Sequence, residues 1–254
     1  MARAGFKLTQ IHPPRHDWYR PIAAHLRSAY LRYSFTYGTR QEVDFLYAEL
    51  GLEKGMRLLD VGCGPGRHAV EFAKRGVEVS AVDISPDFVS IARERAREAG
   101  VSLSAFEMDA RQLPFEDEFD AVMSLCEGAF GLGIDDLSIL RGMARGLKPG
   151  GNLAVGAMNV FYVLEHGRSA GEFDLSSMLY RETVEVVGAD SSKQSFEMWN
   201  SCFTPRELEW LGNGAGLEAI GVFGVSPGEY ARTSPTADHP ELLLLAKKVE
   251  EEAL

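Results

Sequence analysis

Between residues 56 and 158, short apolar runs alternate with amphipathic stretches. Five runs have the length and the Val, Leu and Ala content of buried strands: 56–61, 77–83, 101–108, 119–125 and 153–158. Three segments between them have the apolar spacing of helices: 67–75, 86–99 and 135–146. Strands that alternate with helices predict an α/β fold, in which helices cover both faces of a doubly wound, mostly parallel sheet.

The rhythm changes after residue 158. Four further runs have the character of strands: 180–187, 194–203, 217–225 and 242–248. The first two alternate like an antiparallel pair. Thr204, with Glu207 three residues later, is typical of a capped helix start, and this helix is expected to end near 214–216. We therefore expect the C-terminal part to complete the sheet, with 159–203 inserted before it.

The composition is that of a globular protein without a nucleic-acid partner. Of the 254 residues, 45% are hydrophobic and 25% are charged, which suits one large domain. The 26 Lys and Arg residues are outnumbered by 37 Asp and Glu residues, so the formal net charge is -11. Because binding to phosphates requires a basic face, no nucleic-acid partner is expected.

Cysteine usage and the longest apolar run bear on the compartment. Cys63, Cys126 and Cys202 are odd in number, far apart and without C-x-x-C spacing, so neither a disulfide framework nor a metal site is expected. A reducing, cytoplasmic location follows as the expectation. Residues 1–10 lack the apolar core of a signal peptide, and 153–164 is too short to span a bilayer, so no membrane association is expected.

One loop carries most of the chemical information. Residues 58–68 read LLDVGCGPGRH: an apolar strand with an acid near its end, a loop with glycine at 62, 64 and 66, and a helix start. Such glycines let the backbone turn tightly and approach a ligand without a Cβ in the way. The free N–H groups of the following helix favour an anionic or electron-rich ligand. A strand, a glycine loop and a helix in this order are typical of nucleotide binding.

The spacing of the glycines narrows the choice of nucleotide. A dinucleotide fingerprint needs glycine where Arg67 stands, and no Gly-Lys-Ser/Thr follows to form a P-loop. Asp60, directly before the loop, adds like charge to a pyrophosphate but suits a ligand with an amino group. These residues resemble motif I of the class I S-adenosyl-L-methionine (SAM) dependent methyltransferases. The resemblance implies a Rossmann-like sheet of seven strands, the last of them antiparallel, and SAM as the cofactor.

Polar residues also follow the other strands, at the sheet edge where ligands of open parallel sheets bind. Asp83 lies 17 residues beyond Gly66, Asp109 follows the third strand, and Cys126 and Glu127 follow the fourth. Acids are also common at strand ends for local reasons, as turn and cap residues. Together with the glycine loop, their spacing favours a ligand site.

The resemblance implies a role for each of these residues. Asp83 would accept hydrogen bonds from the ribose hydroxyls, and Asp60 would hold the ammonium group of the cofactor. Asp109 and Ala110 would contact the adenine edge, and Ile84 would pack on the adenine face. The other expected cofactor residues are Gly62, Cys63, Gly64 and Gly66 in the loop, Cys126 after the fourth strand, and Tyr33 in the N-terminal segment.

A narrower resemblance concerns the N-terminal segment. Residues 30–45 read as an aromatic helix, 64–68 read GPGRH, and 127–131 read EGAFG, which is similar to bacterial small-molecule methyltransferases with a C-G-x-G-R-H loop. In that branch the N-terminal segment closes over SAM, which implies that Tyr33 or Tyr37 contacts the cofactor carboxylate. The alternative is an amphipathic helix that only packs on the domain.

We expect a single methyltransferase domain over residues 1–254. Its parts, in order, are an N-terminal helical cap (1–50), a SAM-binding core (51–158), an acceptor lid (159–203) and the C-terminal part of the sheet (204–254). The apolar residues 22–31 pack either on this domain or on a second subunit, so the chain is expected to be a monomer or a homodimer.

The predicted activity is SAM-dependent methyl transfer to a small-molecule acceptor, through an oxygen, nitrogen or carbon atom. Transfer is an in-line displacement, which depends on alignment and exclusion of water. A base is needed only when the acceptor loses a proton, and the candidates are Glu127 and His166. Two alternatives stay open: a SAM-binding protein without transferase activity, and a nicotinamide-dependent oxidoreductase, against which Arg67 argues.

Overall fold

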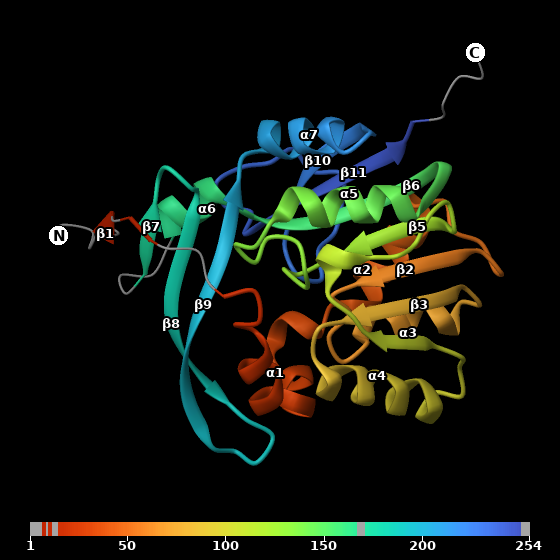
Figure 1. Ribbon diagram of the computed structural model, residues 1–254, viewed down its shortest axis with the longest axis horizontal. Helices are drawn as coiled ribbons and strands as arrows, with labels where there is room; N and C mark the ends of the chain where they lie inside the picture. Colours follow the sequence, from red (N-terminus) through yellow and green to blue (C-terminus); the bar gives the residue numbers. More distant parts are fainter. Residues whose placement is uncertain (1–6, 9, 12–14, 167–170, 250–254) are drawn as a thin grey trace.

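A computed structural model describes residues 7–8, 10–11, 15–166 and 171–249 (Figure 1). Five parallel strands form the centre of its sheet, in the order β4-β3-β2-β5-β6. Their bounds are Arg57–Val61 (β2), Glu78–Asp83 (β3), Ser104–Glu107 (β4), Phe119–Ser124 (β5) and Leu147–Asn159 (β6). The carboxyl ends of these strands therefore meet at one edge of the sheet, as the order of elements predicts.

Two strands differ in length from the prediction. β4 begins at Ser104 rather than at 101, because the N–H of Val101 still closes the preceding helix by donating to the carbonyl of Ala96, 3.0 Å away. β6 begins at Leu147 rather than at 153, because Leu147 already pairs with Phe119 of β5.

The last two strands complete the sheet. β11 (Glu241–Lys248) lies antiparallel between β6 and β10 (Leu217–Val225). In the described part of the chain, the strands of the core thus follow the order β4-β3-β2-β5-β6-β11-β10, with β11 alone reversed among them. The predicted doubly wound, mostly parallel sheet is confirmed.

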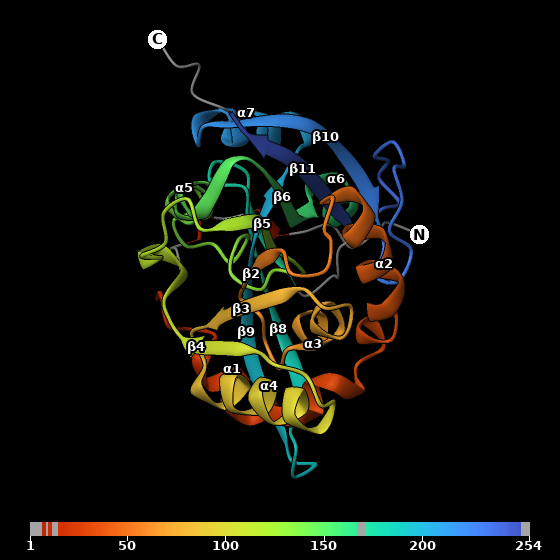
Figure 2. The same ribbon diagram turned by 90° about the vertical axis from the view of Figure 1, so that its right-hand side faces the viewer.

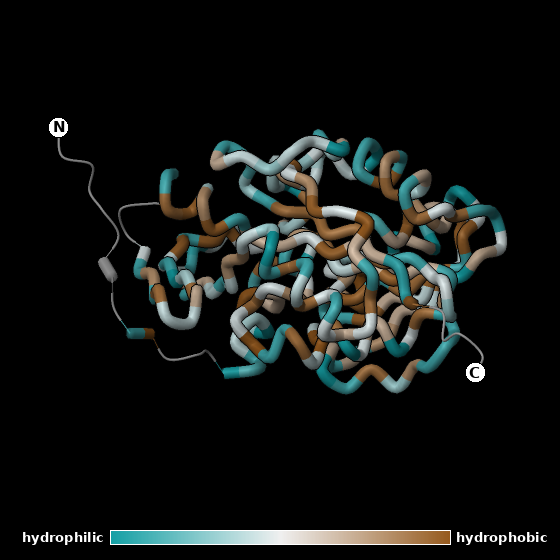
Figure 3. Tube along the Cα trace, turned by 90° about the horizontal axis from the view of Figure 1, so that it is seen from above, coloured by the Kyte–Doolittle hydropathy of each residue, from teal (hydrophilic) through white to brown (hydrophobic). Residues whose placement is uncertain are grey.

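Helices cover both faces of this sheet, and Figure 2 shows α5 on one side and α2 and α3 on the other. The flanking helices are α2 (Thr39–Glu49), α3 (Arg67–Lys74), α4 (Pro86–Glu98), α5 (Asp136–Gly146) and α7 (Pro205–Gly214). Successive residues of β2 point to opposite faces: Leu58 packs with α2 and α3, and Leu59 packs with α5. Hydrophobic residues accordingly concentrate in the middle of the fold (Figure 3).

The N-terminal segment is not the single aromatic helix predicted over 30–45. It contains α1 (Arg20–Leu26), two short 3-10 turns (Arg27–Arg32 and Ser34–Thr36), and then α2. The prediction was wrong because Tyr33 is extended, with φ -74° and ψ 139°, and because Gly38 lies against Gly228. A Cβ on Gly38 would come 2.0 Å from the Cα of Gly228, so only glycine fits where the segment enters α2.

The apolar side of α1 packs on the domain itself. Ile22, Ala23 and Leu26 form one buried cluster with Phe88 of α4 and Val186 of the insertion. Three of the apolar residues in the 22–31 segment therefore have apolar neighbours within the domain itself.

The insertion after β6 forms a mostly antiparallel extension, which joins the main sheet where Met158 and Asn159 of β6 pair in parallel with Cys202 and Phe203. Its elements are α6 (Val160–His166), β7 (Glu172–Asp174), β8 (Leu179–Val187) and β9 (Lys193–Phe203), and β1 (Lys7–Leu8) pairs with β7. The two long strands match the predicted pair at 180–187 and 194–203, whereas α6 was not foreseen. In Figure 1 the β8–β9 hairpin runs past α1 on the side of the sheet to which β3 and β5 point.

Together, α1 and this hairpin cover the carboxyl edge of the core strands. None of the helices in the described ranges combines the length and the apolar character needed to cross a membrane.

Candidate cofactor and active site

The glycine loop leaves β2 with three left-handed residues. Gly62, Gly64 and Gly66 have φ values of 77°, 53° and 74°, a region that side chains with a Cβ rarely adopt. The N–H groups of Gly62 and Cys63 both donate to the carbonyl of Val82, at 2.8 and 3.0 Å. A Cβ on Gly64 would meet nothing within 4 Å, so the loop bends around open space.

Asp83 ties the end of β3 to this loop. Its Oδ2 accepts from the N–H of Gly64 and its Oδ1 accepts from the N–H of Ser85, both at 2.8 Å. Burial raises the pKa of Asp83 to about 6, against the opposing effect of those two hydrogen bonds. Each carboxylate oxygen has a second lone pair, which leaves acceptor capacity for hydroxyl donors.

Asp60, in β2, has a polar atom without a partner. Its side chain is 3% exposed, and no group in the described ranges donates to its Oδ2. Burial raises the pKa of Asp60 to about 7, Arg67 lowers it, and the charge of Asp83 raises it further. A buried carboxylate oxygen left unpaired is costly, so this atom suits a donor from a ligand, such as an ammonium group.

A narrow cavity extends from the loop past the ends of β3 and β4. Its lining includes Gly62, Ile84, Asp109 and Ala110, as the expected adenine contacts require. Asp109 also caps the 3-10 turn Ala110–Gln112, and the guanidinium of Arg111 donates to both of its carboxylate oxygens. The carboxylate of Asp109 therefore already has a charged partner in Arg111, and Asp109 also contributes to the wall of the cavity.

The N-terminal segment forms the opposite wall of this cavity. His16, Trp18 and Tyr19 line it, and the indole N–H of Trp18 donates to the carbonyl of Leu132 at 3.2 Å. Burial raises the pKa of Tyr19, with the negative charges of Asp83 and Glu127 adding to the effect. The N-terminal segment therefore covers the strand ends that carry the predicted cofactor residues.

The turn after β5 is strained. Cys126 and Glu127 are consecutive non-glycine residues with φ values of 52° and 47°, a conformation that persists where the surroundings hold it. The guanidinium of Arg67 donates to the Sγ of Cys126, which supports the turn. The Oε1 of Glu127 is buried without a partner in the described ranges, and burial raises the pKa of this side chain.

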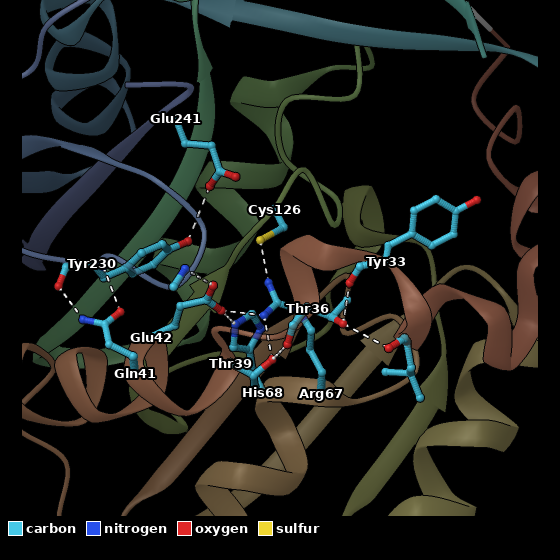
Figure 4. A network of polar contacts seen from close by, with 12 residues as sticks. Tyr33, Thr36, Thr39, Gln41, Glu42, Arg67, His68, Cys126, Tyr230 and Glu241 are labelled. Atoms are coloured by element: carbon cyan, nitrogen blue, oxygen red, sulfur yellow. Dashed lines mark hydrogen bonds and ion pairs between the residues drawn. The ribbon is translucent and has the colours of Figure 1, made fainter. Parts of the chain in front are cut away.

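Arg67 and Glu42 form the centre of a buried polar network (Figure 4). The guanidinium of Arg67, 4% exposed, donates to Glu42 at 2.5 Å and to the hydroxyl of Thr39 at 2.9 Å. His68 lies 2.7 Å from the same Glu42 oxygen, and the N–H of Gly228 donates to the other at 2.8 Å. The network thus joins α2, the glycine-loop helix and the loop after β10.

Electrostatics fix the protonation of this network. Burial alone works to raise the pKa of Glu42, but the contacts with His68 and Arg67 bring it below its ordinary value. Burial and the charge of Arg67 lower the pKa of His68 to about 4. At neutral pH, a neutral imidazole therefore donates to an ionised Glu42, and His68 has a structural role.

The network continues to Glu241, the first residue of β11 (Figure 4). The Gln41 side chain exchanges two hydrogen bonds with the backbone of Tyr230, at 2.8 and 2.9 Å. The hydroxyl of Tyr230 donates to Glu241 at 3.4 Å. Burial raises the pKa of Glu241 well above its ordinary value, and the charges of Glu127 and Glu42 add to this.

Two predicted residues lie away from this site. The hydroxyl of Tyr33 accepts from the N–H of Val187 at 3.3 Å, so Tyr33 serves the contact with the β8–β9 hairpin, and its ring points away from the network (Figure 4). Tyr37 is 74% exposed. Tyr19 and Tyr30 lie inward instead: Tyr19 lines the cavity, and both rings pack against Phe88. Burial raises the pKa of Tyr30.

His166 also lies outside the cluster at the strand ends. It is exposed at the end of α6, stacks on Tyr162 and lies 3.7 Å from Asp238. Of the two base candidates, the structure therefore brings only Glu127 to the glycine loop.

Sequence reasoning missed Glu42, Glu241 and the function of Arg67. A signal for Glu42 was present, because it shares a helix face with the buried Leu46, where a charged residue needs a partner. Glu241, directly before the apolar run of β11, had no comparable signal.

Comparison with known proteins agrees with this geometry. A family model described as a methyltransferase domain matches residues 58–151. The ubiquinone biosynthesis O-methyltransferase of Xanthomonas axonopodis pv. citri (strain 306) is 30% identical over 204 residues, which cover 77% of this chain and 76% of that protein. The CcbJ methyltransferase from Streptomyces caelestis has a similar fold, with a TM-score of 0.68, 21% identity, and coverage of 83% of this chain and 89% of that one.

A shorter match concerns a second relative. The ubiquinone biosynthesis O-methyltransferase of Xanthomonas oryzae pv. oryzae (strain PXO99A) is 36% identical over 121 residues, 46% of this chain. This match spans about half, 48%, of that relative's length.

The chain belongs to the class I SAM-dependent methyltransferases, whose cofactor is S-adenosyl-L-methionine. This assignment replaces the nicotinamide alternative.

Proposed function

We propose that the protein transfers the methyl group of SAM to a small-molecule acceptor. The proposal is carried by Asp60 and Asp83, which lie at the ends of adjacent strands around an open glycine loop. The Oδ2 of Asp60 is buried and has no partner among the residues that the structure describes. An ammonium group and a pair of ribose hydroxyls would satisfy these two acids. SAM carries both.

Each residue has a distinct task toward the cofactor. Asp60 would hold its ammonium group, and Asp83 would accept from its ribose. Ile84, Asp109 and Ala110 would surround its adenine in the cavity that they line. The loop residues Gly62, Cys63, Gly64 and Gly66, with Cys126 opposite, would lie against its methionine part.

The protein would align the acceptor with the methyl group and exclude water from the reaction. When bound, SAM supplies an activated methyl group, and displacement proceeds once the acceptor atom lies in line with it. Tyr19 and Tyr30 from the cap and the β8–β9 hairpin cover the strand ends, where they would exclude water. The insertion at 159–203 would in this way serve as the acceptor lid.

The net charge and the cysteines favour a small-molecule acceptor in a reducing compartment. A net charge of -11 disfavours nucleic acid, and the three cysteines are free thiols, as in the cytoplasm. The names of the similar Xanthomonas proteins support oxygen as the methylated atom.

Calorimetric titration with S-adenosylhomocysteine tests the cofactor part of the proposal. We expect micromolar binding by the wild type and loss of at least about tenfold in Asp83→Ala, because a charge-assisted hydrogen bond contributes about 1.5–3 kcal/mol. Asp117→Ala, which removes an exposed carboxylate paired with Lys248, is the matched control and should bind like the wild type. No binding by the wild type would refute the proposal.

A further inference from the structure

Two acids outside the expected cofactor contacts, Glu127 and Glu241, lie at the same edge of the sheet. Glu127 follows β5, and Glu241 begins β11, which is antiparallel, so its first residue lies where the parallel strands end. A Cβ on Gly156 of β6 would come 3.3 Å from the N–H nitrogen of Cys126 and 3.7 Å from the Oε2 of Glu241. Glu241 and the turn that carries Glu127 thus flank the same glycine.

Neither acid is neutralised by an ion pair in the described ranges. Among the residues that the structure describes, the Oε1 of Glu127 is buried and has no partner. In the same part of the chain, the hydrogen bond found for the carboxylate of Glu241, which is 8% exposed, is the long one from Tyr230. Arg67, whose charge lowers the pKa of Glu241, donates to Glu42 and Cys126 instead.

Glu127 borders the predicted cofactor site, because the next two residues, Gly128 and Ala129, line the cavity beside Gly62. The negative charges of Asp83 and Glu127 both act to raise the pKa of Tyr19, which lines the same cavity. Six other titratable or charged groups surround the pair. They are Tyr30 of the cap, Glu42 of α2, Arg67 of α3, Cys126 of the β5 turn, Cys202 of β9 and Tyr230 of the loop before β11.

We propose that Glu127 and Glu241 hold one proton between them, and that Glu127 takes the proton which the acceptor loses. The acceptor is accordingly a hydroxyl or amine compound rather than a carboxylate. This inference rests on the proposed function. Two neighbouring carboxyl groups in a buried site cannot both ionise cheaply, which leaves one proton on the pair. A carboxylate acceptor would bring a further negative charge into this space.

The chemistry balances with these groups alone. A hydroxyl acceptor gives its proton to the Glu127 carboxylate as its oxygen forms the bond to the methyl carbon; the methyl–sulfur bond breaks, and its electron pair stays on sulfur. A protonated amine gives a proton to Glu127 first and then forms the carbon–nitrogen bond. S-adenosylhomocysteine leaves in both cases, and Glu127 releases its proton to solvent after turnover.

Burial supports this assignment. It raises the pKa of both Glu127 and Glu241, and the charge of Glu127 adds to the rise at Glu241. A raised pKa brings a carboxylate toward the range in which a general base works at neutral pH. Arg67 is a positioning residue in this arrangement, because its contact with Cys126 holds the strained turn that aims Glu127.

Infrared titration of the carboxyl groups tests the pair without an acceptor. We expect the wild type to hold a protonated carboxyl at neutral pH. In Glu127→Gln the remaining Glu241 should titrate at lower pH, and in Glu241→Gln the same should hold for Glu127, because each loses a neighbouring negative charge. Glu229→Gln, an exposed glutamate in the preceding loop, is the control and should leave the titration unchanged. Titration of each acid independent of the other would overturn the inference.

Turnover assays then test the base. Wild type and Glu127→Gln are screened with phenols, amines and carboxylates, and S-adenosylhomocysteine formation is measured. We expect transfer to a phenol or an amine, with kcat about 10²–10⁴-fold lower in Glu127→Gln and unchanged binding of S-adenosylhomocysteine. Turnover with carboxylates only, or an unaffected kcat, would contradict the inference. If nothing turns over, the proposed function fails, and the infrared result still decides the pair.

Discussion

Gly62 and Gly128 are in direct backbone contact. A Cβ on Gly62 would lie 2.1 Å from the carbonyl carbon of Gly128, and a Cβ on Gly128 would lie 2.3 Å from the carbonyl oxygen of Gly62. The cofactor loop after β2 and the turn that carries Glu127 are therefore packed so closely that only glycine fits on either side.

Substitution of either glycine should be costly. We expect Gly62→Ala and Gly128→Ala each to lower the free energy of unfolding by about 2–4 kcal/mol, because backbone atoms have to move apart. Gly100→Ala is the control: Gly100 also has a positive φ, of 68°, but a Cβ there meets nothing within 4 Å, so about 1–2 kcal/mol is expected. Urea unfolding measures all three, and equal losses would contradict the role of the contact.

Removal of Arg67 should expose the cost of a buried, unpaired acid. Arg67→Met leaves Glu42, which is 0% exposed, without its charged partner, and about 3–5 kcal/mol of stability should be lost. Arg75→Met, which removes the partly exposed ion pairs of Arg75 with Asp44 and Glu71, should cost about 1 kcal/mol or less. The double variant with Glu42→Gln should recover part of the loss in urea unfolding. A loss as small as that of Arg75→Met would argue against the network.

Cofactor affinity should depend on pH through Asp60. Because burial raises the pKa of Asp60 to about 7, the acid is protonated below that pH and cannot pair with an ammonium group. We expect S-adenosylhomocysteine to bind more weakly at pH 5.5 than at pH 8, with protons released on binding. Calorimetry in buffers of different ionisation enthalpy measures both, and Asp60→Asn should flatten this dependence. An equally steep profile in the variant would assign the effect to another group.

Asp60 should also make the stability of the protein depend on pH. The pKa of Asp60 is raised from 3.8 in the unfolded chain to about 7 in the fold, so the folded state binds the proton more tightly. Its contribution to stability is fully present below about pH 4 and is lost as the pH rises through 7. Relative to Asp60→Asn, the wild type without cofactor should therefore lose stability between pH 4 and pH 7. Unfolding of both proteins at several pH values checks the sign, and a gain would contradict it.

Substitutions of the cap residues Tyr33 and Tyr19 should differ in their effect on cofactor affinity. Tyr33→Phe removes a hydroxyl that accepts from Val187, so affinity for S-adenosylhomocysteine should not change. Tyr19→Ala opens the roof of the cavity and should weaken binding by about tenfold, an estimate that corresponds to about 1.4 kcal/mol. Calorimetry on both variants measures this, and the reverse order would restore Tyr33 as the cofactor contact.

The predictable part of the site is the part encoded in local chain segments. The glycine loop, Asp60 and Asp83 are close in sequence to strand ends, and parallel strands deliver their carboxyl ends to one edge whatever lies elsewhere. The cap was mispredicted because the helix breaks at the extended Tyr33, and because Gly38 meets Gly228, which is distant in sequence. Aromatic residues at helical spacing gave no sign of that contact.

The alternation of apolar runs and helices in this chain was sufficient to define its sheet, and the glycine spacing with Asp60 was sufficient to define its cofactor, because both depend on short-range chemistry. Which tyrosine faces the cofactor space, what Arg67 holds, and that Glu127 shares its surroundings with Glu241 were decided by the tertiary structure. Residues 42, 67, 127 and 241 meet only when α2, α3, the β5 turn and β11 pack together. Buried charges find partners across such distances because leaving them unpaired costs more than local propensities contribute.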